Sequence, residues 1–537
     1  MAKKTKAAQT MDGRRVNKIE ERRVIFASSL GTMFEWYDFY LYATLAPFFA
    51  ALFFPPGNET AALLSAFATY AAGFLVRPFG ALVFGRLGDL VGRKHTFLIT
   101  IVVMGVSTFA VGLLPTFQTI GWLAPILLVS LRLLQGLALG GEYGGAATFV
   151  AEHAPDAQRG YATSWIQTTA TLGFFLSLLV IGACRVGMDA RDFSEWGWRI
   201  PFIVSLALLA FSVYIRMKLN ESPVFLKMKS EGRGSKSPLT DSFLRYPNNK
   251  YVLLALFGAT AGQGVVWYTG QFYALFFLTI TLKLDFLVAY GLIAAALLIG
   301  TPFFVFFGWL SDRIGRLKII MAGCLIAALT YFPLFHGLTH YVNPALEKFQ
   351  QTTTITVAAQ DCKMHILVLP GTQFSPCDRV KDFLSKSGLS FMSLPAIADE
   401  QVVTTIGASQ IKGWNEAALK EALKTAGYTA HADPRQVNYP MTLAILVLMV
   451  MYVTMVYGPI AAFLVEMFPT NIRYTSMSFP YHIGNGWFGG MLPLLATAIV
   501  AATGNIYNGL WYPIGVAVMT LVIGTIFLKE TKDVKIH

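Results

Sequence analysis

Runs of apolar residues long enough to cross a membrane recur along almost the whole chain. About 18 to 20 apolar residues span a bilayer core as a helix, and a backbone in lipid must satisfy its own polar groups. Charged residues make up only 13% of the chain, about half of the fraction usual in soluble proteins. We therefore expect an all-α polytopic membrane protein. Its twelve transmembrane helices are expected at about residues 24–53, 61–84, 96–115, 121–150, 161–184, 198–217, 251–281, 286–308, 317–338, 439–464, 474–501 and 509–528.

A short polar motif occurs twice, after the second and after the eighth apolar run. The stretches from Gly85 to Lys94 and from Gly308 to Lys318 both follow the pattern G-x-L-x-D-x-x-G-R. One copy alone would suit an ordinary polar hairpin loop. Two copies at matching places indicate an internal repeat, which divides the transmembrane region into two six-helix halves. We expect both loops to act in gating through their shared residues, which are Gly85, Asp89, Gly92, Arg93, Gly308, Asp312, Gly315 and Arg316.

Lysine and arginine are distributed unevenly between the predicted loops. The net charge is +12, and the cations gather in both tails, in residues 218–250 and in the two repeated loops. By the positive-inside rule we expect these segments, and both termini, in the cytoplasm. This placement explains the charge without a nucleic-acid partner. The basic start leads into a run that is too long, and contains Glu35 and Asp38, so a cleavable signal peptide is not expected.

Two long polar segments interrupt the predicted helices. Residues 218–250 are expected as a cytoplasmic loop between the halves, whereas residues 339–438 follow the ninth run and are expected outside. In the second segment, β-like runs (Thr352–Ala358, His365–Leu369) alternate with helix-like runs such as Asn415–Ala426, which favours a small α/β domain. The expected segments are a cytoplasmic tail (1–23), the N-terminal half (24–217), a central loop (218–250), helices seven to nine (251–338), the α/β insert (339–438), helices ten to twelve (439–528) and a second cytoplasmic tail (529–537).

Two of the four cysteines, Cys362 and Cys377, lie in the expected insert. In the oxidising space outside a bacterial inner membrane they would form a disulfide. Two unpaired thiols are the alternative. Their spacing does not match a zinc site. Cys184 and Cys324 fall in apolar runs and are interpreted as small core residues.

Seven further stretches resemble a single transporter family. They are Gly31 to Phe39 (GTMFEWYDF), Val76 to Gly80 (VRPFG), Arg132 to Gly136 (RLLQG), Gly140 to Gly145 (GGEYGG), Trp198 to Phe202 (WRIPF), Glu221 to Pro223 (ESP) and Glu466 to Arg473 (EMFPTNIR). With the doubled loop, they are similar to the metabolite:proton symporter family of the major facilitator superfamily, which includes shikimate, α-ketoglutarate, citrate and proline/betaine carriers. The resemblance implies two rocking halves and proton-coupled transport. Residues 339–438 depart from the family, which has a short connection there, and Leu90 stands where it more often has Arg.

Ionisable side chains of the first and fourth predicted helices are expected near the middle of the bilayer. At 1.5 Å per residue, Glu35 lies about 15 Å and Asp38 about 20 Å from the cytoplasmic boundary, and Arg132 lies about 15 Å from the outer one. Charged groups at such depth are costly and mark functional sites. We expect Asp38, Glu35 and Arg132 to carry proton coupling, which the resemblance supports. A static ion pair that fixes the two helices is the alternative.

Other polar residues in the apolar runs suggest a gate and a binding cavity. Arg77, about 6 Å from the cytoplasmic boundary, and Glu142 at similar depth predict an inner gate or a structural pair. Direct contact of Arg77 with the substrate is the alternative. A polar and aromatic stripe from Gln263 to Gln271 suits a cavity for a small organic acid or zwitterion. The expected substrate-binding residues are Tyr42, Gln135, Gln263, Trp267, Tyr268, Gln271, Tyr457, Tyr481 and Asn485, with His482 beside them. For each aromatic residue, packing or a place in an interfacial belt is the alternative.

The sequence has no Walker loop, no H-E-x-x-H motif and no paired C-x-x-C. We therefore predict neither an ATP-driven pump nor an enzyme, and neither a metal nor a cofactor. The leading hypothesis is a monomeric secondary active transporter of the inner membrane. It would move a small polar metabolite, an organic acid or a zwitterion, together with a proton as the coupling ion. The alternatives are an uncoupled facilitator or exporter, and a transporter-like sensor that uses the insert.

Overall fold

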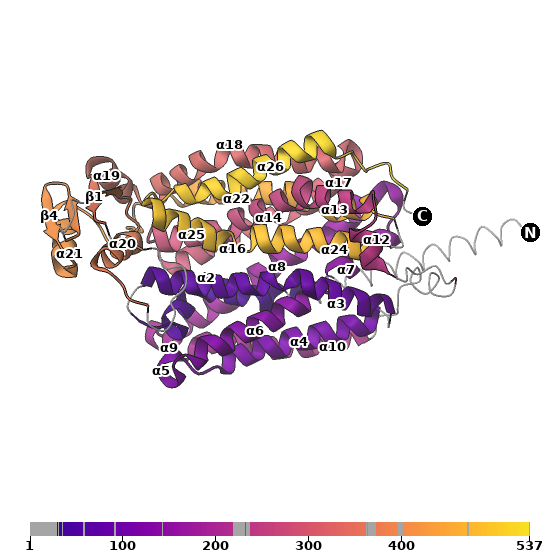
Figure 1. Cartoon of the computed structure of the whole chain (residues 1–537), viewed down its shortest axis with the longest axis horizontal. Helices are drawn as coiled ribbons and strands as arrows, with labels where there is room; N and C mark the ends of the chain where they lie inside the picture. The colour runs from indigo at the N-terminus through magenta and orange to yellow at the C-terminus, as the bar shows by residue number, and fades with distance from the viewer. Residues whose placement is uncertain are drawn as a thin grey trace, which may run out of the picture.

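The structure is a computed structural model. It describes residues 29, 32–34, 36–56, 59–90, 93–141, 143–217, 231, 237–360, 362–363, 372–395, 401–469 and 472–535. The molecule is a long bundle of helices with a small lobe at one end, which carries the β-sheet (Figure 1). The last described residues lie at the other end of the bundle. We call these two ends the insert end and the tail end.

The N-terminal half begins with a helix over residues 36–53, called the first helix. Its other helices are α2 (Glu59–Leu75), α3 (Arg77–Leu90), α4 (Arg93–Leu113), α5 (Phe117–Ile120), α6 (Leu123–Gly140), α7 (Tyr143–His153), η1 (Asp156–Gln158), α8 (Arg159–Val186), α9 (Ala190–Glu195), η2 (Gly197–Arg199) and α10 (Ile200–Met217). The second predicted helix is divided at Val76, between α2 and α3. Pro78 explains this break, because proline has no N–H to continue α2 but is tolerated in the first turn of α3.

The C-terminal half contains π-helical segments where continuous α-helices were predicted. Its elements are α12 (Pro238–Phe243), α13 (Asn248–Ala255), η3 (Leu256–Thr260), α14 (Ala261–Tyr268), η4 (Thr269–Tyr273), α15 (Ala274–Phe276), η5 (Phe277–Thr281), α16 (Phe286–Gly300), α17 (Pro302–Ile314), α18 (Arg316–Val342), α22 (Tyr439–Tyr457), α23 (Ile460–Met467), α24 (Arg473–Ile483), η6 (Gly484–Gly489), α25 (Leu492–Thr503), η7 (Asn508–Leu510) and α26 (Trp511–Phe527). Of these, η3, η4, η5 and η6 are π-helical. Glycines let two of the irregular helices approach, because a Cβ on Gly264 would lie 2.9 Å from the carbonyl carbon of Gly484.

The helical membrane fold is confirmed. Within the described ranges, ten helices are long and apolar enough to cross a membrane, and a shorter apolar helix covers Leu98–Leu113. Together with the first helix, they place a helix in each of the twelve predicted runs. Most of the expected central loop, at 218–230 and 232–236, lies outside the described residues.

The two halves pack against each other along several pairs of helices, with α8 against α16 and α17, α2 against α25, and α3 against α24. In Figure 1 the indigo-to-purple helices of the N-terminal half lie along one side of the bundle and the pink-to-yellow helices along the other. Near the tail end, a Cβ on Gly308 would lie 2.5 Å from Oγ of Ser164 and 2.7 Å from the carbonyl oxygen of Gly160. This glycine of the second repeated loop is therefore required by close packing between the halves.

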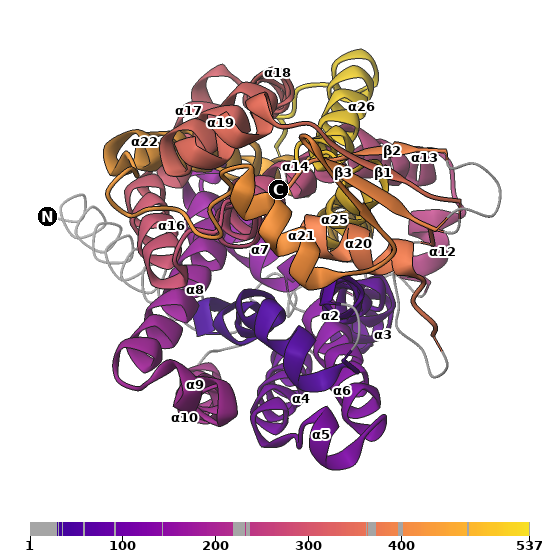
Figure 2. The ribbon, with the colours of Figure 1, turned by 90° about the vertical axis from the view of Figure 1, so that its left-hand side faces the viewer.

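The insert is a small α/β lobe between α18 and α22. Its four-stranded sheet has the order β2-β1-β3-β4, in which β1 pairs in parallel with β2, and the β1–β3 and β3–β4 pairs are antiparallel. The strands are β1 (Ile355–Ala358), β2 (Met392–Leu394), β3 (Val403–Ile406) and β4 (Ser409–Lys412), and the helices are α19 (Pro344–Thr352), α20 (Pro376–Lys386) and α21 (Glu416–Thr425). The predicted β-like run His365–Leu369 lies outside the described residues. Seen from the insert end, α20 lies over the boundary between the two halves (Figure 2).

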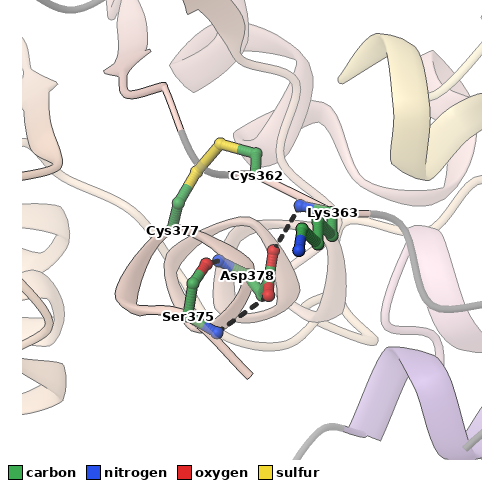
Figure 3. Close-up of a disulfide and its surroundings, with 5 residues drawn as sticks. All are labelled: Cys362, Lys363, Ser375, Cys377 and Asp378. Carbon is green, nitrogen blue, oxygen red and sulfur yellow. Dashed lines mark hydrogen bonds between the residues drawn. A yellow bond between two sulfur atoms is a disulfide. The ribbon is translucent and has the colours of Figure 1, made fainter. Parts of the chain in front are cut away.

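A capping box and a disulfide fix the start of α20. The hydroxyl of Ser375 accepts the N–H of Asp378 at 3.1 Å, and the carboxylate of Asp378 accepts the N–H of Ser375 at 2.8 Å and that of Lys363 at 2.7 Å (Figure 3). Cys377, in the first turn, is bonded to Cys362. Capping satisfies N–H groups that a helix start leaves free, so α20 has a defined first turn.

Candidate functional site

Two buried arginines lie against one aromatic ring of the first helix. The guanidinium carbons of Arg77 and Arg132 are 4.2 Å and 4.7 Å from the ring centroid of Phe39. Arg77 also lies 4.0 Å from the ring of Phe74, and Arg132 lies 4.5 Å from that of Tyr42. The two arginines are 1% and 0% exposed. Contact with aromatic faces offsets part of the cost of burying two positive charges.

Glycines bring the helices that carry these arginines into backbone contact. A Cβ on Gly136 of α6 would lie 2.6 Å from the carbonyl carbon of Gly73 in α2, and one on Gly140 would lie 2.8 Å from the backbone nitrogen of Ala81 in α3. A Cβ on Gly73 would in turn lie 3.5 Å from Nη2 of Arg132. The glycines of the fourth predicted helix are therefore packing residues that set where the guanidinium of Arg132 lies.

Several N–H groups of the two arginines have no acceptor in the described part of the protein. Nη1 of Arg132 donates to Oε1 of Gln135 at 2.5 Å, and Nε2 of Gln135 donates to Oγ1 of Thr108 at 2.9 Å. Nε and Nη2 of both Arg77 and Arg132 are buried without a hydrogen-bond partner there. Most buried polar groups in proteins are hydrogen-bonded, so these donors suit an acceptor that enters from outside the chain.

The predicted contact between Asp38 and Arg132 is not formed in this structure. Asp38 is buried, and its Oδ1 has no hydrogen-bond partner among the residues described. Arg132 bonds Gln135 instead and lies over Phe39. Consecutive helical residues point about 100° apart, so when Phe39 faces the arginines Asp38 lies on the neighbouring side of the helix. Glu35 lies outside the described residues.

The predicted residues of the C-terminal half form one buried polar cluster. Gln263 and Asn485 exchange two hydrogen bonds through their amides, at 2.9 Å and 2.8 Å. The hydroxyls of Tyr457 and Tyr481 lie 2.6 Å apart. Nε2 of Gln271 donates across the halves to Oγ1 of Thr171 at 3.4 Å. These residues are buried, and the spacing of the seventh helix therefore gathers its amides at the centre of the bundle.

Aromatic rings join this cluster to the arginines of the other half. Tyr40 of the first helix stacks on Trp267, with centroids 5.5 Å apart, and Phe74 meets Tyr268 edge-on at 5.6 Å. Phe74 is the same ring that contacts Arg77. The structure therefore brings Tyr42, Gln135 and the predicted residues of the seventh, tenth and eleventh helices around one place between the halves.

Three residues of this cluster were not predicted. Nε2 of Gln167 in α8 donates to the hydroxyl of Tyr143 at 2.5 Å, and the ring of Tyr143 stacks on Tyr481 at 3.5 Å. Tyr40 is the third. A lone glutamine in an apolar run was a usable signal for Gln167, whereas the tyrosines resemble ordinary packing residues.

His482 was expected beside the binding residues. Both of its ring nitrogens are buried without a hydrogen-bond partner in the described ranges.

The predicted inner gate is only partly described. Glu142 lies outside the described residues, so its pairing with Arg77 is not defined. Arg77 itself lies in the same aromatic cluster as Arg132, through Phe39. Arg77 therefore belongs with Arg132 to the central site.

The second repeated loop joins the two halves near the tail end. The carboxylate of Asp312 pairs with Arg316 at 2.8 Å and accepts the N–H groups of Gly160 and Tyr161 at 2.9 Å and 2.8 Å. These N–H groups lie in the first turn of α8, in the other half, where a negative charge is favoured. In the first copy, Gly92 lies outside the described residues, as do the side chains of Asp89 and Arg93 and the surroundings of Gly85.

A buried carboxylate extends this network. Glu466 pairs with Arg159 of the N-terminal half at 2.8 Å and with Arg316 at 3.0 Å, and it accepts the hydroxyl of Thr531 at 2.7 Å. Glu530 accepts the N–H of Arg316 at 2.7 Å, and a Cβ on Gly315 would lie 2.7 Å from its carboxyl carbon. Gly315 has φ +118°, a left-handed backbone conformation that favours glycine, and the side chain of Glu530 would have to move to admit a Cβ.

Comparisons with known proteins agree with this architecture. The family described as "Sugar (and other) transporter" matches residues 24–242. The shikimate transporter of Escherichia coli K12 is 36% identical over 322 residues, which cover 59% of this chain and 72% of that protein. The proline/betaine transporter of E. coli K12 is 36% identical over 341 residues, covering 62% and 68%. A structure of the proton:xylose symporter XylE, an E. coli protein, has a TM-score of 0.63 at 16% identity and covers 97% and 98% of the two chains.

These relatives are transporters, and at 36% identity over more than two thirds of their length they show the family. The solved structure shows the same fold. The protein is thus a multi-pass membrane transporter and not an enzyme. Its doubled loop, its two helical halves and its relatives place it in the major facilitator superfamily, among the metabolite transporters related to the shikimate and proline/betaine carriers.

Proposed function

We propose that the protein imports a small metabolite that carries a carboxylate, together with a proton. The observation that carries this proposal is the pair of buried arginines, Arg77 and Arg132, whose Nε and Nη2 atoms lack acceptors within the described residues. A carboxylate offers two acceptor oxygens and a negative charge, and arginine binds it through paired N–H groups. Such a substrate would satisfy the free donors and offset the buried charge together.

The surrounding rings and amides favour a small and partly apolar molecule. Trp267 and Tyr268 of the C-terminal half contact Tyr40 and Phe74 of the N-terminal half, and Phe74 in turn contacts Arg77. Shikimate, proline and betaine, after which the relatives are named, each carry one carboxylate. A zwitterion would also place its cationic end on these aromatic faces. The amide of Gln271 would accept a polar donor of the substrate, because its Oε1 is buried without a partner in the described part of the chain. The amide of Gln263 is bonded to Asn485 and would have to exchange that pair to bind the substrate.

Asp38 is the proposed site of the coupling proton. It is a buried carboxylate next in sequence to Phe39, the ring that both arginines contact. A negative Asp38 would oppose the entry of a second carboxylate, whereas a proton on Asp38 removes that repulsion. Proton and anion would then enter and leave as a pair while the two halves rock about the site.

The proposed orientation places the insert end outside an inner membrane and the tail end, with both termini, in the cytoplasm. The cations of the second repeated loop and of residues 529–535 lie at the tail end, which suits the cytoplasmic side. We propose that the protein works as a monomer, with the proton as its coupling ion and without a further cofactor.

The test is uptake by the purified protein in proteoliposomes, with shikimate, proline, betaine and simple dicarboxylates as probes. We expect accumulation of at least one probe when the outside is acidic, and little accumulation without the gradient. Arg77→Lys and Arg132→Lys should weaken uptake. Arg185→Lys is the matched control. The guanidinium carbon of Arg185 also lies against an aromatic ring, 4.9 Å from the ring centroid of Phe193, but Arg185 is not part of the site. Equal uptake with and without the gradient would indicate an uncoupled facilitator instead.

A further inference from the structure

The insert is firmly attached to the C-terminal half. The N–H of Phe391 donates to the carbonyl of Gly504 at 2.7 Å, next to the end of α25. The N–H of Ala432 donates to the carbonyl of Lys283 at 3.2 Å. The side chains of Leu389 and Phe391 are buried. Backbone hydrogen bonds and buried apolar side chains of this kind hold the lobe on its own half.

Two glycines show how close this attachment is. Gly388 has φ +69°, and a Cβ there would lie 3.1 Å from the carbonyl carbon of Thr281 at the end of η5. Gly504 has φ +71°, and a Cβ there would lie 2.9 Å from the ring of Phe391. Each position combines a left-handed backbone with too little space for a side chain, so both need glycine. The insert should therefore move as one body with the C-terminal half.

The same lobe also contacts the N-terminal half, through α20 and the start of α2. Oδ2 of Asp382 accepts the N–H of Glu59 at 3.2 Å, and Nζ of Lys386 donates to Oε1 of Glu59. Asp382 and Lys386 are four residues apart and therefore lie on one face of α20. The negative Asp382 meets the N-terminus of α2, where a negative charge is favoured. Lys386 and Glu59 are 51% and 68% exposed, so this contact is wet and easily broken.

The helix that makes this contact is held from both sides. Its start is fixed by the Cys362–Cys377 disulfide and by the Ser375–Asp378 capping box (Figure 3). Its inner face buries Val380 and Leu384 in the lobe. The two charged residues are therefore presented toward α2 from a rigid support, at the boundary that Figure 2 shows end-on.

From these contacts we propose that α20 is a clasp between the halves, formed by Asp382 and Lys386 on one side and Glu59 on the other. It stabilises the state in which the insert ends of the halves are together, and it opens when they part. The clasp rests on the proposed rocking of the halves but not on the identity of the substrate. Since one exposed ion pair and one exposed cap are weak, the clasp should change the ratio of closed to open states by only about two- to fivefold.

The test measures this ratio directly, in the full-length protein in nanodiscs. Spin labels on Asp192→Cys in α9 and Gln410→Cys in β4 report the distance between the N-terminal half and the insert, in a background with Cys184→Ser and Cys324→Ala. Lys386→Glu places a negative charge beside Glu59 and should move the distance distribution toward longer values. Lys424→Glu, the same reversal on an exposed residue of α21, is the matched control and should leave the distribution as in the wild type. Adding Glu59→Gln to Lys386→Glu should recover part of the shift, because the repulsion needs Glu59.

Salt and cross-linking give two further measurements. Raising the salt concentration should lengthen the distances in the wild type and have less effect in Lys386→Met. A disulfide between Glu59→Cys and Lys386→Cys should hold the distances short, whereas one between Ser390→Cys and Ile506→Cys, within the C-terminal half, should not. If Lys386→Glu and Lys424→Glu give the same distribution in well-folded protein, the clasp is refuted. Because the readout needs no transported molecule, it separates failure of the clasp from failure of the proposed transport function.

Discussion

Replacing Gly136 with alanine should push α6 away from α2 and displace Arg132. The new Cβ would lie 2.6 Å from the carbonyl carbon and 2.9 Å from Cα of Gly73, and closer still to its carbonyl oxygen. Carbon atoms pack at about 3.5–4.0 Å, so the two backbones must separate by about 1 Å. Because the neighbour is backbone, no side chain can rotate away to relieve the clash.

Overpacking of this kind costs about 1–3 kcal/mol. We therefore expect the melting temperature of the purified protein to fall by about 1–3 °C, because the shift per kcal/mol becomes smaller as a chain becomes longer. Arg132 lies one turn before Gly136, so its guanidinium should also move by about 1 Å, and uptake should fall by about tenfold or more.

Gly182→Ala is the matched control. It is also a glycine in a long helix, α8, but a Cβ there would meet no atom within 4 Å. Alanine should be neutral or slightly stabilising at this position. Equal melting temperatures and uptake rates for Gly136→Ala, Gly182→Ala and the wild type would refute the reasoning.

Three more predictions concern charged residues. Asp312→Asn should slow the transport cycle and leave the substrate affinity within about threefold of that of the wild type. The substitution weakens the ion pair with Arg316 at the tail end and does not change the central site. Uptake kinetics that show a large loss of affinity at normal turnover would contradict this. Asp38→Asn should abolish accumulation driven by a proton gradient and leave exchange of labelled substrate; accumulation equal to the wild type would exclude Asp38 as the coupling site. Burial lowers the pKa of Lys283 from 10.5 to about 8, and the nearby Lys386 contributes to this lowering, so the charged form is disfavoured in the folded state. This lowers the stability of the folded protein in full below about pH 8, and the effect fades as the pH rises to 10.5. Lys283→Met should therefore raise the melting temperature at pH 7 and lose this gain at pH 10. A gain in melting temperature that does not depend on pH would contradict the prediction.

The sequence predicted the helices well because their signal is local. A run of apolar residues must become a helix in lipid, whatever packs beside it. The π-helical turns of the seventh helix were not predicted, because an apolar run carries no signal for them. The first of these turns, η3, ends at Thr260, and a Cβ on Gly484 would lie 2.5 Å from the carbonyl carbon of Thr260, a contact between residues far apart in sequence. The break at Val76 was visible in principle, since Pro78 follows it.

The candidate site was predicted unevenly for a related reason. Helical spacing placed Gln263 and Gln271 on one face, and both are buried at the centre. Depth alone suggested that Asp38 faces Arg132, but depth says nothing about direction around the helix axis, and Phe39 occupies that face. The contact of the insert with the other half could not be read from the sequence, because Glu59 and Lys386 are 327 residues apart.

The central claim, that Arg77 and Arg132 bind the carboxylate of the substrate, is tested most directly by titration calorimetry. The purified protein is titrated with a transported carboxylate and with its uncharged amide. The wild type should bind the carboxylate at least tenfold more tightly, and Arg132→Lys should lose about 1.5–3 kcal/mol of that binding, or about 10- to 150-fold. Arg185→Lys should bind as the wild type does. Equal affinities for acid and amide, or unchanged binding in Arg77→Lys and Arg132→Lys, would contradict the account.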